Sequence, residues 1–196
     1  PRARHMDLTI EQWAKVKARQ GVELVSSGEL KVVDDNGVEV AKDGETLGEI
    51  TVRGNVVMTG YYNDPESTAA AIKDGWFYTG DAAVVHDDGY LEIRDRFKDV
   101  IISGGENISS VEVEGCLLHH PAVLEAAVVG MPHEKWGEAP HAFVVLHNGK
   151  ISSEDELRSH VRENLAHFKT PQWFSFVPDL PKTATGKVQK FLLRDG

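Results

Sequence analysis

The stretch from Asp95 to Asn107 reads DRFKDVIISGGEN, and the pattern of the chain changes within it. Before it, short apolar segments alternate with turn residues, which is typical of antiparallel strands joined by hairpins. After it, strand-like and helical segments alternate, which favours an α+β domain. The sequence therefore predicts a boundary between Ile93 and Lys98, with an antiparallel β part over residues 1–97 and a small α+β domain over residues 98–196.

Two turns predict β-hairpins in the first part, because asparagine and glycine tolerate the positive φ of a tight turn. The first turn, Asp34–Gly37, joins Leu30–Val33 to Val38–Val40. The second turn, Asp87–Gly89, joins Ala82–Val85 to Tyr90–Ile93. A short helix is expected over Leu8–Ala18, ahead of these strands.

In the second part, a serine followed three residues later by glutamate marks the start of two helices. This spacing is the capping box, which satisfies free amides at the first helical turn. Leu157, Val161 and Leu165 recur every four residues and predict one buried stripe on the second helix. The expected elements are a strand at Val100–Ile102, a helix from Ser109, an apolar segment at Val123–Val129, a strand at Ala142–Leu146 and a helix from Ser153.

The composition indicates an ordinary globular protein. Hydrophobic residues make up 41% and charged residues 27% of the 196 positions, enough for one or two domains with apolar cores. The formal net charge of −10 disfavours non-specific binding to nucleic acid or to anionic membranes, since both reward clustered positive charge. A polyanionic ligand therefore needs a local basic patch.

The sequence also indicates a location. Cys116 is the single cysteine, so an intrachain disulfide is impossible and a reducing compartment is indicated. No apolar run approaches the ~20 residues that a membrane helix needs, and no secretory signal is visible. The protein is expected to be cytoplasmic.

The segment Pro181–Lys187 places a lysine directly after a glycine turn. It is not a Walker A loop, because Pro181 and Val188 stand where that loop needs a glycine and a serine or threonine. What remains is a cation on a long stem, suited to stabilising negative charge on a phosphate or carboxylate oxygen. From the residues alone, a solvated surface lysine is the alternative interpretation.

A second motif, Tyr78-Thr79-Gly80-Asp81, ends on an aspartate that could accept both hydroxyls of a ribose. A turn aspartate that binds nearby amides is the alternative. Together with Asp95–Asn107 and Pro181–Lys187, and in this order, the motif closely resembles the adenylate-forming superfamily of acyl-CoA synthetases, peptide-synthetase adenylation domains and luciferases. The resemblance runs from Val22 to Arg194 and includes the segments Gly48–Gly54 and Gly60–Tyr62.

Within that superfamily, the segment Ser103–Ser110, followed by Glu112 and Glu114, is most similar to acyl-CoA synthetases that act on short or medium carboxylic acids. The resemblance implies an AMP-forming ligase that joins such an acid to coenzyme A through an acyl-adenylate. A close alternative passes the acyl group to the phosphopantetheine of a carrier protein. A third interpretation is a non-catalytic module that binds a nucleotide or a protein partner.

The resemblance implies a role for each matching residue. Lys187 would stabilise charge while the carboxylate attacks ATP, and Asp81 and Arg96 would contact the ribose. Lys98 falls at the hinge about which the small mobile domain turns between two catalytic poses. The Gly104-Gly105-Glu106 loop would then approach the thiol arm of coenzyme A, and glycines permit close approach of the backbone.

Structural alternatives remain open for several of these residues. Arg96 could form a surface ion pair with Asp95 or Asp99, and the two glycines could form a plain β-turn. Four basic residues could bind the phosphates of coenzyme A: Lys169, Lys182, Lys190 and Arg194. The alternative for such side chains is that they are solvated. Trp136-Gly137-Glu138 matches a family loop for which only a domain contact is suggested.

No metal site is predicted in the chain. His119, His120, His133 and His141 fall within one stretch, but they lack the spacing of a helical zinc pair and no thiolate pair supports them. Mg²⁺ is expected to arrive with ATP, held mainly by its phosphates and by residues upstream of the chain. A serine hydrolase is unsupported, because no Gly-x-Ser-x-Gly elbow is present.

The family also carries an upstream phosphate loop and an aromatic-Gly-x-Thr-Glu segment, and neither occurs here. The chain thus resembles the C-terminal third of such an enzyme, whose large N-terminal domain would be its partner. It is predicted to be inactive alone, with the acyl pocket almost entirely upstream of Pro1. A start at Pro1 fits this interpretation, and a tag remnant ending in His5-Met6 is the alternative explanation for that start.

Overall fold

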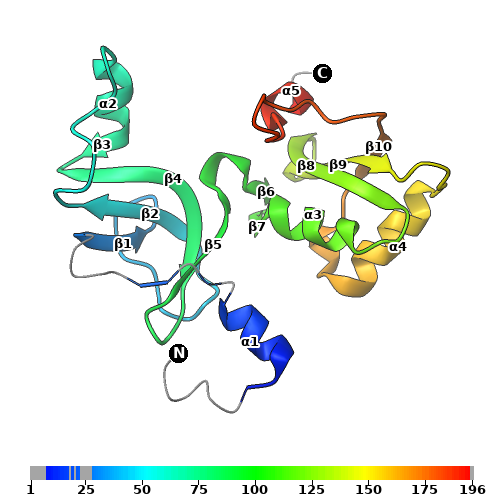
Figure 1. The fold of residues 1–196 in the computed structure, drawn as a ribbon, viewed down its shortest axis with the longest axis horizontal. Coiled ribbons are helices and arrows are strands. Elements are labelled where there is room, and N and C mark those ends of the chain that lie inside the picture. Colours follow the sequence, from blue (N-terminus) through cyan, green and yellow to red (C-terminus); the bar gives the residue numbers. More distant parts are fainter. Residues whose placement is uncertain (1–7, 18, 20, 23–27, 195–196) are drawn as a thin grey trace. The chain divides into compact units, whose positions relative to one another are not determined.

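The computed structural model describes residues 8–17, 19, 21–22 and 28–194. The chain forms two compact units, Pro1–Phe97 and Lys98–Gly196 (Figure 1). This division lies inside the interval from Ile93 to Lys98, where the sequence changes its pattern. The segment His5-Met6 and the last residue of the expected first helix, Ala18, lie outside the described residues.

The first unit is built on one antiparallel sheet with the strand order β1-β2-β4-β3, in which β5 also pairs with β4. This arrangement confirms the antiparallel fold expected for this part of the chain. Val32, Ile50, Ala83 and Leu91 are buried together and form its apolar core. The strands are β1 (Glu29–Val33), β2 (Gly48–Arg53), β3 (Ile72–Lys73), β4 (Trp76–Val85) and β5 (Leu91–Arg96).

The two predicted hairpins have different outcomes. Strands β4 and β5 pair up to Val85↔Leu91 around the Asp87–Gly89 turn, which confirms that hairpin. The Asp34–Gly37 turn also forms, with Asp34 Oδ1 accepting the amide of Val38 at 2.9 Å. However, the prediction of a strand at Val38–Val40 is wrong. This segment forms only one bridge to β1, between Val33 and Glu39, and this contact is too short for a strand.

The described part of the first unit also contains two α-helices. Helix α1 (Ile10–Lys17) begins two residues later than expected, because Thr9 caps it: the Thr9 hydroxyl accepts the amide of Gln12 at 3.3 Å. Helix α2 (Pro65–Ala71) was not predicted. Its signals were present in the sequence, since Asp64 accepts the amide of Ser67 and proline occupies the first turn, where it needs no amide partner.

The second unit is a mixed five-stranded sheet with helices packed on it, and this confirms the α+β class. The strand order is β10-β9-β6-β7, with β8 also paired to β9. Strand β10 runs parallel to β9, whereas the other pairs are antiparallel. Strand β10 and helix α5 were not expected. The elements are β6 (Ile101–Ser103), β7 (Glu106–Ile108), α3 (Ser110–Leu118), β8 (Val123–His133), β9 (Gly137–Leu146), α4 (Glu154–Asn164), β10 (Trp173–Phe176) and α5 (Lys190–Arg194).

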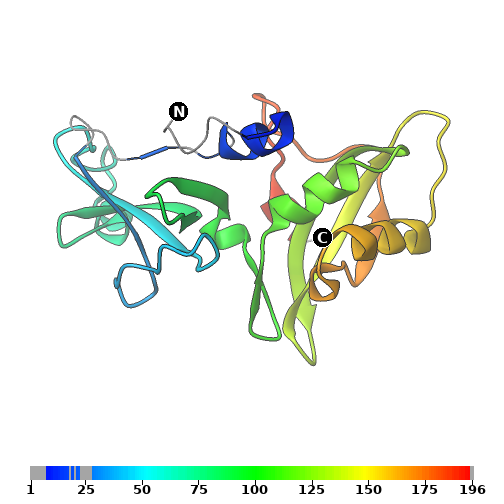
Figure 2. The ribbon, with the colours of Figure 1, turned by 90° about the horizontal axis from the view of Figure 1, so that it is seen from below.

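Helices α3 and α4 lie next to each other against the sheet of the second unit (Figure 2). The predicted stripe on α4 is buried as expected, with Leu157 and Val161 fully enclosed and Leu165 packed at the edge of the core. They meet Leu117 of α3 and Phe174 of β10 in one apolar cluster. Helix α5 instead contacts β8.

Both predicted helix starts are confirmed, with Ser109 and Ser153 as the N-caps. Ser153 forms a complete capping box, because its partner Glu156 accepts the amide of Ser153 at 3.0 Å. That amide is the main cause of the lowered pKa of Glu156. The ionised Glu156 carboxylate therefore contributes its full stabilisation of the folded state when the pH is above the ordinary pKa of glutamate. This contribution is lost as the pH falls through the lowered pKa of the folded state.

Replacing Ser153 by alanine should lower the free energy of unfolding by about 0.5–2 kcal/mol. The reason is that the amide of Glu156 loses the Ser153 hydroxyl, which accepts it at 3.2 Å. Denaturant unfolding of the chain measures this change. Ser159→Ala, at an exposed serine inside the same helix, is the control. Equal stability of both variants would show that the cap contributes nothing.

Candidate active site

Lys187 lies on a short hairpin between β10 and α5. The hairpin closes through an antiparallel bridge between Lys182 and Val188, and the amide of Thr183 donates to the carbonyl of Lys187 at 2.8 Å. Gly186 takes a φ of +84°, a conformation that favours glycine at the tip of the turn. These contacts fix the backbone of Lys187, and the residue itself is exposed.

The other basic residues of this C-terminal segment are already paired. Lys182 binds Glu125, Lys190 lies 2.7 Å from Glu114, and Arg194 lies 2.6 Å from Asp99. Over the described residues 181–194, Lys187 is the one cation whose side chain has no hydrogen-bond or ion-pair partner. An unpaired cation on a braced turn is available to bind an anionic ligand.

Asp81 and Arg96 are brought together as direct partners on β4 and β5. The Arg96 guanidinium lies 3.0 Å from Asp81 Oδ1, so its partner is neither Asp95 nor Asp99. Gly80, with a φ of +74°, turns the chain just before Asp81, and its amide donates to Glu49 Oε1 at 2.9 Å. Glu49 thus supports this turn, a role that the sequence gave no reason to assign.

The Gly104-Gly105-Glu106 segment forms the tip of the β6–β7 hairpin. Both glycines take positive φ, +61° and +89°, so the plain β-turn geometry is also present. The Gly104 amide donates to the carbonyl of Trp136 at 2.9 Å, and an added Cβ at Gly104 would lie 3.4 Å from the Trp136 ring. Trp136, for which the sequence suggested only a domain contact, therefore also supports the tip of this hairpin.

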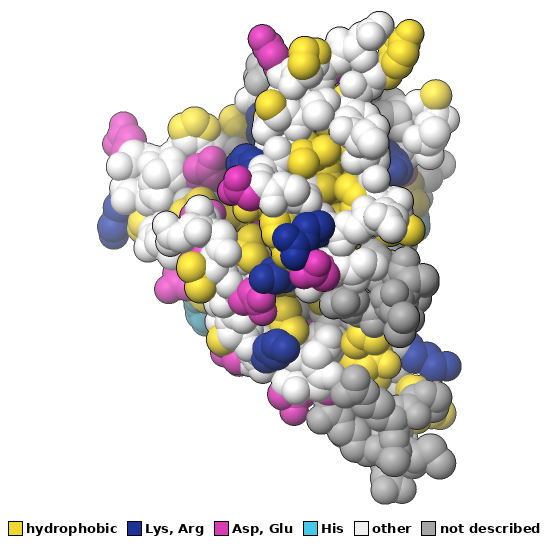
Figure 3. Space-filling view, turned by 90° about the vertical axis from the view of Figure 1, so that its left-hand side faces the viewer, with side chains coloured by type: hydrophobic (Ala, Val, Ile, Leu, Met, Phe, Trp, Pro, Cys, Tyr) yellow, Lys and Arg dark blue, Asp and Glu magenta, His cyan; other side chains and the backbone are white. Residues whose placement is uncertain are grey.

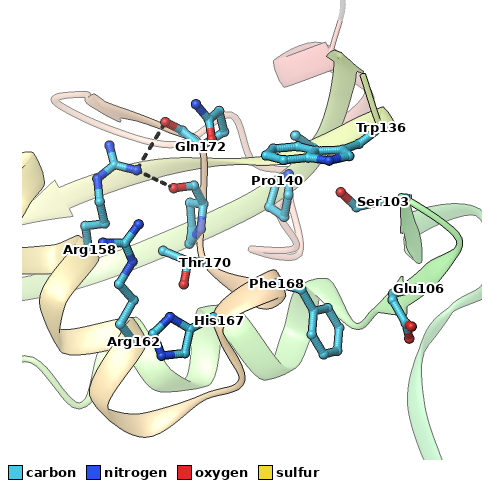
Figure 4. A pocket seen from close by; sticks show the side chains of 13 residues that line it. Ser103, Glu106, Trp136, Pro140, Arg158, Arg162, His167, Phe168, Thr170 and Gln172 are labelled. Atoms are coloured by element: carbon cyan, nitrogen blue, oxygen red, sulfur yellow. Dashed lines mark hydrogen bonds between the residues drawn. The ribbon is translucent and has the colours of Figure 1, made fainter. Parts of the chain in front are cut away.

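A cavity of about 360 Å³ opens beside this tip within the second unit. Figure 4 shows Ser103 and Glu106 at one end, Arg158, Arg162 and His167 at the other, and the rings of Trp136 and Phe168 on opposite sides. Arg158 is committed to the carbonyl oxygens of Pro171 and Gln172, at 2.8 and 3.3 Å. Arg162 is exposed. The sequence did not single out these cavity cations, because they come together only through α4 and the turn at His167–Lys169.

Lys169 and Lys190, both candidates for the phosphates of coenzyme A, are occupied. Lys169 Nζ lies 2.6 and 2.8 Å from the two carboxylate oxygens of Glu112. Lys190 Nζ contacts Glu114 and the hydroxyl of Ser110, at 2.7 and 2.5 Å. Each lysine would have to leave a carboxylate before it could bind a phosphate.

Lys98 is the first residue of the second unit and lies in a short 3-10 turn, Phe97–Asp99. Its carbonyl oxygen accepts a hydrogen bond from Arg194 at 3.2 Å, and the same guanidinium binds Asp99. The peptide that follows Lys98 is thereby attached to α5 of its own unit.

Histidines serve structural contacts in this part of the protein. His141 Nε2 lies 2.9 Å from the hydroxyl of Ser175, and burial lowers the pKa of this imidazole. His160 contacts the carbonyl of Cys116 at 2.9 Å. Across the described ranges, no three His, Cys, Asp or Glu side chains are grouped to hold a metal ion. Nor does the described part of the chain contain a helix long and apolar enough to cross a membrane.

Charged side chains of both signs share the surface of the first unit. On the face drawn in Figure 3, basic and acidic groups lie next to one another around an apolar patch. On β1 and β2, Arg53 binds Glu29 at 2.7 Å and also covers the ring of Trp76, 4.5 Å from its centroid. This pairing leaves little net positive charge on these two strands.

Part of the chain matches a known protein family. Residues 112–187 match the family described as the AMP-binding enzyme C-terminal domain. The chain is 56% identical to 2-methylpropanoate–CoA ligase CCL4 of Humulus lupulus over 93% of its own length, and 47% identical to the peroxisomal trans-cinnamate:CoA ligase of Petunia hybrida over 96%. It covers 34% and 33% of those two relatives.

Among solved structures, the chain is similar to o-succinylbenzoate CoA synthetase of Bacillus subtilis in complex with its acyl-adenylate intermediate. The TM-score is 0.83 and the identity 40%, over 96% of this chain and 38% of that one. The chain thus spans about a third of the length of the relatives that it matches. Residues 112–187 are thus an AMP-binding enzyme C-terminal domain, and the chain as a whole is similar to the C-terminal part of acyl-CoA ligases.

Proposed function

We propose that the whole enzyme activates a short- or medium-chain carboxylic acid with ATP and transfers the acyl group to coenzyme A. In the first step the carboxylate attacks the α-phosphorus of ATP, which forms an acyl-adenylate and releases pyrophosphate. In the second step the thiol of coenzyme A, having lost its proton, attacks the acyl carbon and displaces AMP. The observation that carries this proposal is the unpaired Lys187 on its braced hairpin, among basic neighbours that are all paired.

Lys187 would act in the first step. Negative charge grows on the oxygens around the α-phosphorus as the carboxylate attacks, and an ammonium group positioned there stabilises the transition state more than the ground state. A lysine suits this task because it supplies a compact positive charge on a long stem. Mg²⁺ would be carried by the phosphates of ATP and would neutralise part of their charge.

Asp81 and Arg96 would hold the ribose of ATP. Arg96 occupies Oδ1 of Asp81 at 3.0 Å, which leaves the second carboxylate oxygen to accept from a ribose hydroxyl. The Arg96 ion pair also fixes the orientation of this carboxylate, so less freedom is lost when the nucleotide binds.

The glycine tip and its cavity would act in the second step. The tip has no side chains at Gly104 and Gly105, so the backbone can come close to the thiol arm of coenzyme A. The cavity supplies Trp136 and Phe168 for stacking, and Arg162 and His167 for phosphate groups. We therefore favour Arg162 over the paired Lys169 and Lys190 as the partner of a phosphate.

Both steps would share one site, so the C-terminal domain would turn about Lys98 between them. The first pose would present Lys187 and the second would present the glycine tip. A hinge of this kind needs only a few residues that absorb the backbone change. Turning would remove the adenylation lysine before the thiol enters.

Arg162→Ala in the whole enzyme should raise the KM for coenzyme A about 10-fold or more, since a hydrogen bond to a charged group contributes about 1.5–3 kcal/mol. Acid-dependent release of pyrophosphate should stay unchanged. Lys169→Met is the matched comparison and should change the KM for coenzyme A less than Arg162→Ala does. Steady-state kinetics with varied coenzyme A measures both, and the reverse order would assign the phosphate contact to Lys169.

The proposed function is tested on the whole encoded protein with a panel of carboxylic acids. We expect acid-dependent pyrophosphate release, followed by thioester formation with free coenzyme A. The chain of 196 residues should release no pyrophosphate alone, because it carries no upstream phosphate loop. Adenylation with no turnover of free coenzyme A would instead identify a carrier-protein adenylation domain. The absence of acid-dependent pyrophosphate release would contradict the proposal.

The cytoplasmic location stays a prediction from the sequence. The similar enzyme of Petunia hybrida is named as peroxisomal. A fluorescent fusion of the whole protein, with both termini tested in turn, distinguishes the two compartments.

A further inference from the structure

Lys182, five residues before Lys187, is paired with two carboxylates. Its Nζ lies 2.8 and 2.7 Å from the two oxygens of Glu125 and 3.3 Å from Asp179. The hydrogen bond to Glu125 is the main cause of the raised pKa of Lys182, which keeps this side chain protonated. The two lysines of one hairpin thus differ, since one is paired and the other is free.

The contact joins the hairpin to the sheet of the second unit. Lys182 is the residue that bridges to Val188 at the base of the hairpin, and Glu125 belongs to β8. Just before it, Leu180 is 2% exposed and packs against Ala127 and Val145. The base is therefore held at two points, by an apolar anchor and by an ion pair, and Lys187 follows directly from it.

An ordinary surface ion pair contributes little to stability. The effect of this ion pair on the position of Lys187 matters more here, because a displacement of about 1 Å at a reacting group can lower a rate about 100-fold. The pairing has a second effect, since an unpaired Lys182 would be another cation able to bind phosphate in the wrong place. Glu125 and Asp179 neutralise that charge.

We propose that Lys182 is a positioning residue for the adenylation step, and that its ion pair with Glu125 sets the position of Lys187. This inference rests on the proposed function of Lys187. It assigns Lys182 no contact with the nucleotide, although the sequence made it a candidate for the phosphates of coenzyme A. Within the motif, Lys187 would stabilise charge in the adenylation step, and Lys182 would hold Lys187 in position.

The test uses the whole enzyme with Lys182→Met and with Glu125→Gln. Each change should lower kcat for acid-dependent pyrophosphate release by about 10-fold to 100-fold, because Lys187 is displaced. Thioester formation from a premade acyl-adenylate should stay within about twofold of the unmodified enzyme, since Lys187 takes no part in that step. Lys182→Arg, which keeps the charge and the hydrogen bonds, should retain most of the adenylation rate. The exchanged pair Lys182→Glu with Glu125→Lys should recover more adenylation than either single charge reversal.

Three results would overturn the inference. The first is an unchanged adenylation rate in Lys182→Met and Glu125→Gln while Lys187→Ala is impaired, which would leave the proposed function intact. The second is an equal fall in both steps together with a lower melting temperature, which would make the pair purely structural. The third is a rise in the KM for coenzyme A alone, which would return Lys182 to the phosphates. Lys150→Met, at an exposed lysine of the same unit, serves as the control. An unimpaired Lys187→Ala would instead refute the proposed function itself.

Discussion

Lys187→Ala should lower the adenylation rate of the whole enzyme by about 100-fold to 1000-fold, the cost of removing one preorganised group that stabilises developing charge. The structure supports so large an effect, because the described residues 181–194 offer no second unpaired cation to replace Lys187. Its neighbours Lys182, Lys190 and Arg194 are each held by a carboxylate. The measurement is single-turnover release of pyrophosphate with a saturating acid and ATP.

Two comparisons make this result specific. Thioester formation from a premade acyl-adenylate should be unaffected in Lys187→Ala, since the lysine is proposed to have left the site by then. Lys150→Ala should leave both steps unchanged, because Lys150 is exposed on the turn between β9 and α4. If Lys187→Ala instead released pyrophosphate at the unmodified rate, another group would have to stabilise the α-phosphate.

The largest loss of stability is expected for Leu157→Ala, at about 2–5 kcal/mol. Leu157 is 0% exposed and packs between α4 and the sheet, so its removal costs the buried apolar area and leaves a cavity. Ile151→Ala is the control, since Ile151 is 91% exposed, and it should change stability by less than about 0.5 kcal/mol. Urea unfolding of the chain, followed by circular dichroism, measures both variants. A loss below about 1 kcal/mol for Leu157→Ala would show that the second unit repacks around the gap.

Local signals in the sequence predicted much of the fold. The capping serines Ser109 and Ser153 and the Asp87–Gly89 turn act within a few residues, and the structure confirms each of them. The strand at Val38–Val40 failed because its pairing with β1 stops at the single bridge between Val33 and Glu39, and local propensity does not contain the length of a ladder. Strand β10 was missed for a similar reason, as its parallel partner β9 lies far away in the sequence.

The candidate site was likewise predictable only in part. Asp81, Arg96 and the glycine tip belong to contiguous motifs, and the structure brings Asp81 and Arg96 into direct contact. The state of each lysine could not be predicted, because its partner is distant in the chain: Glu112 lies 57 residues before Lys169, and Glu125 lies 57 residues before Lys182. A solvated lysine and a paired one have the same sequence signature.

The contact of Arg194 with the carbonyl of Lys98 has a mechanical consequence. A peptide group is a rigid plane, and this one is attached to the second unit by Arg194 and Asp99. The rotation that we propose about Lys98 would then be left to the two dihedral angles of Lys98 itself and to the residues before it. Arg194 would thus keep this peptide fixed to the second unit, so that the unit moves as a single piece.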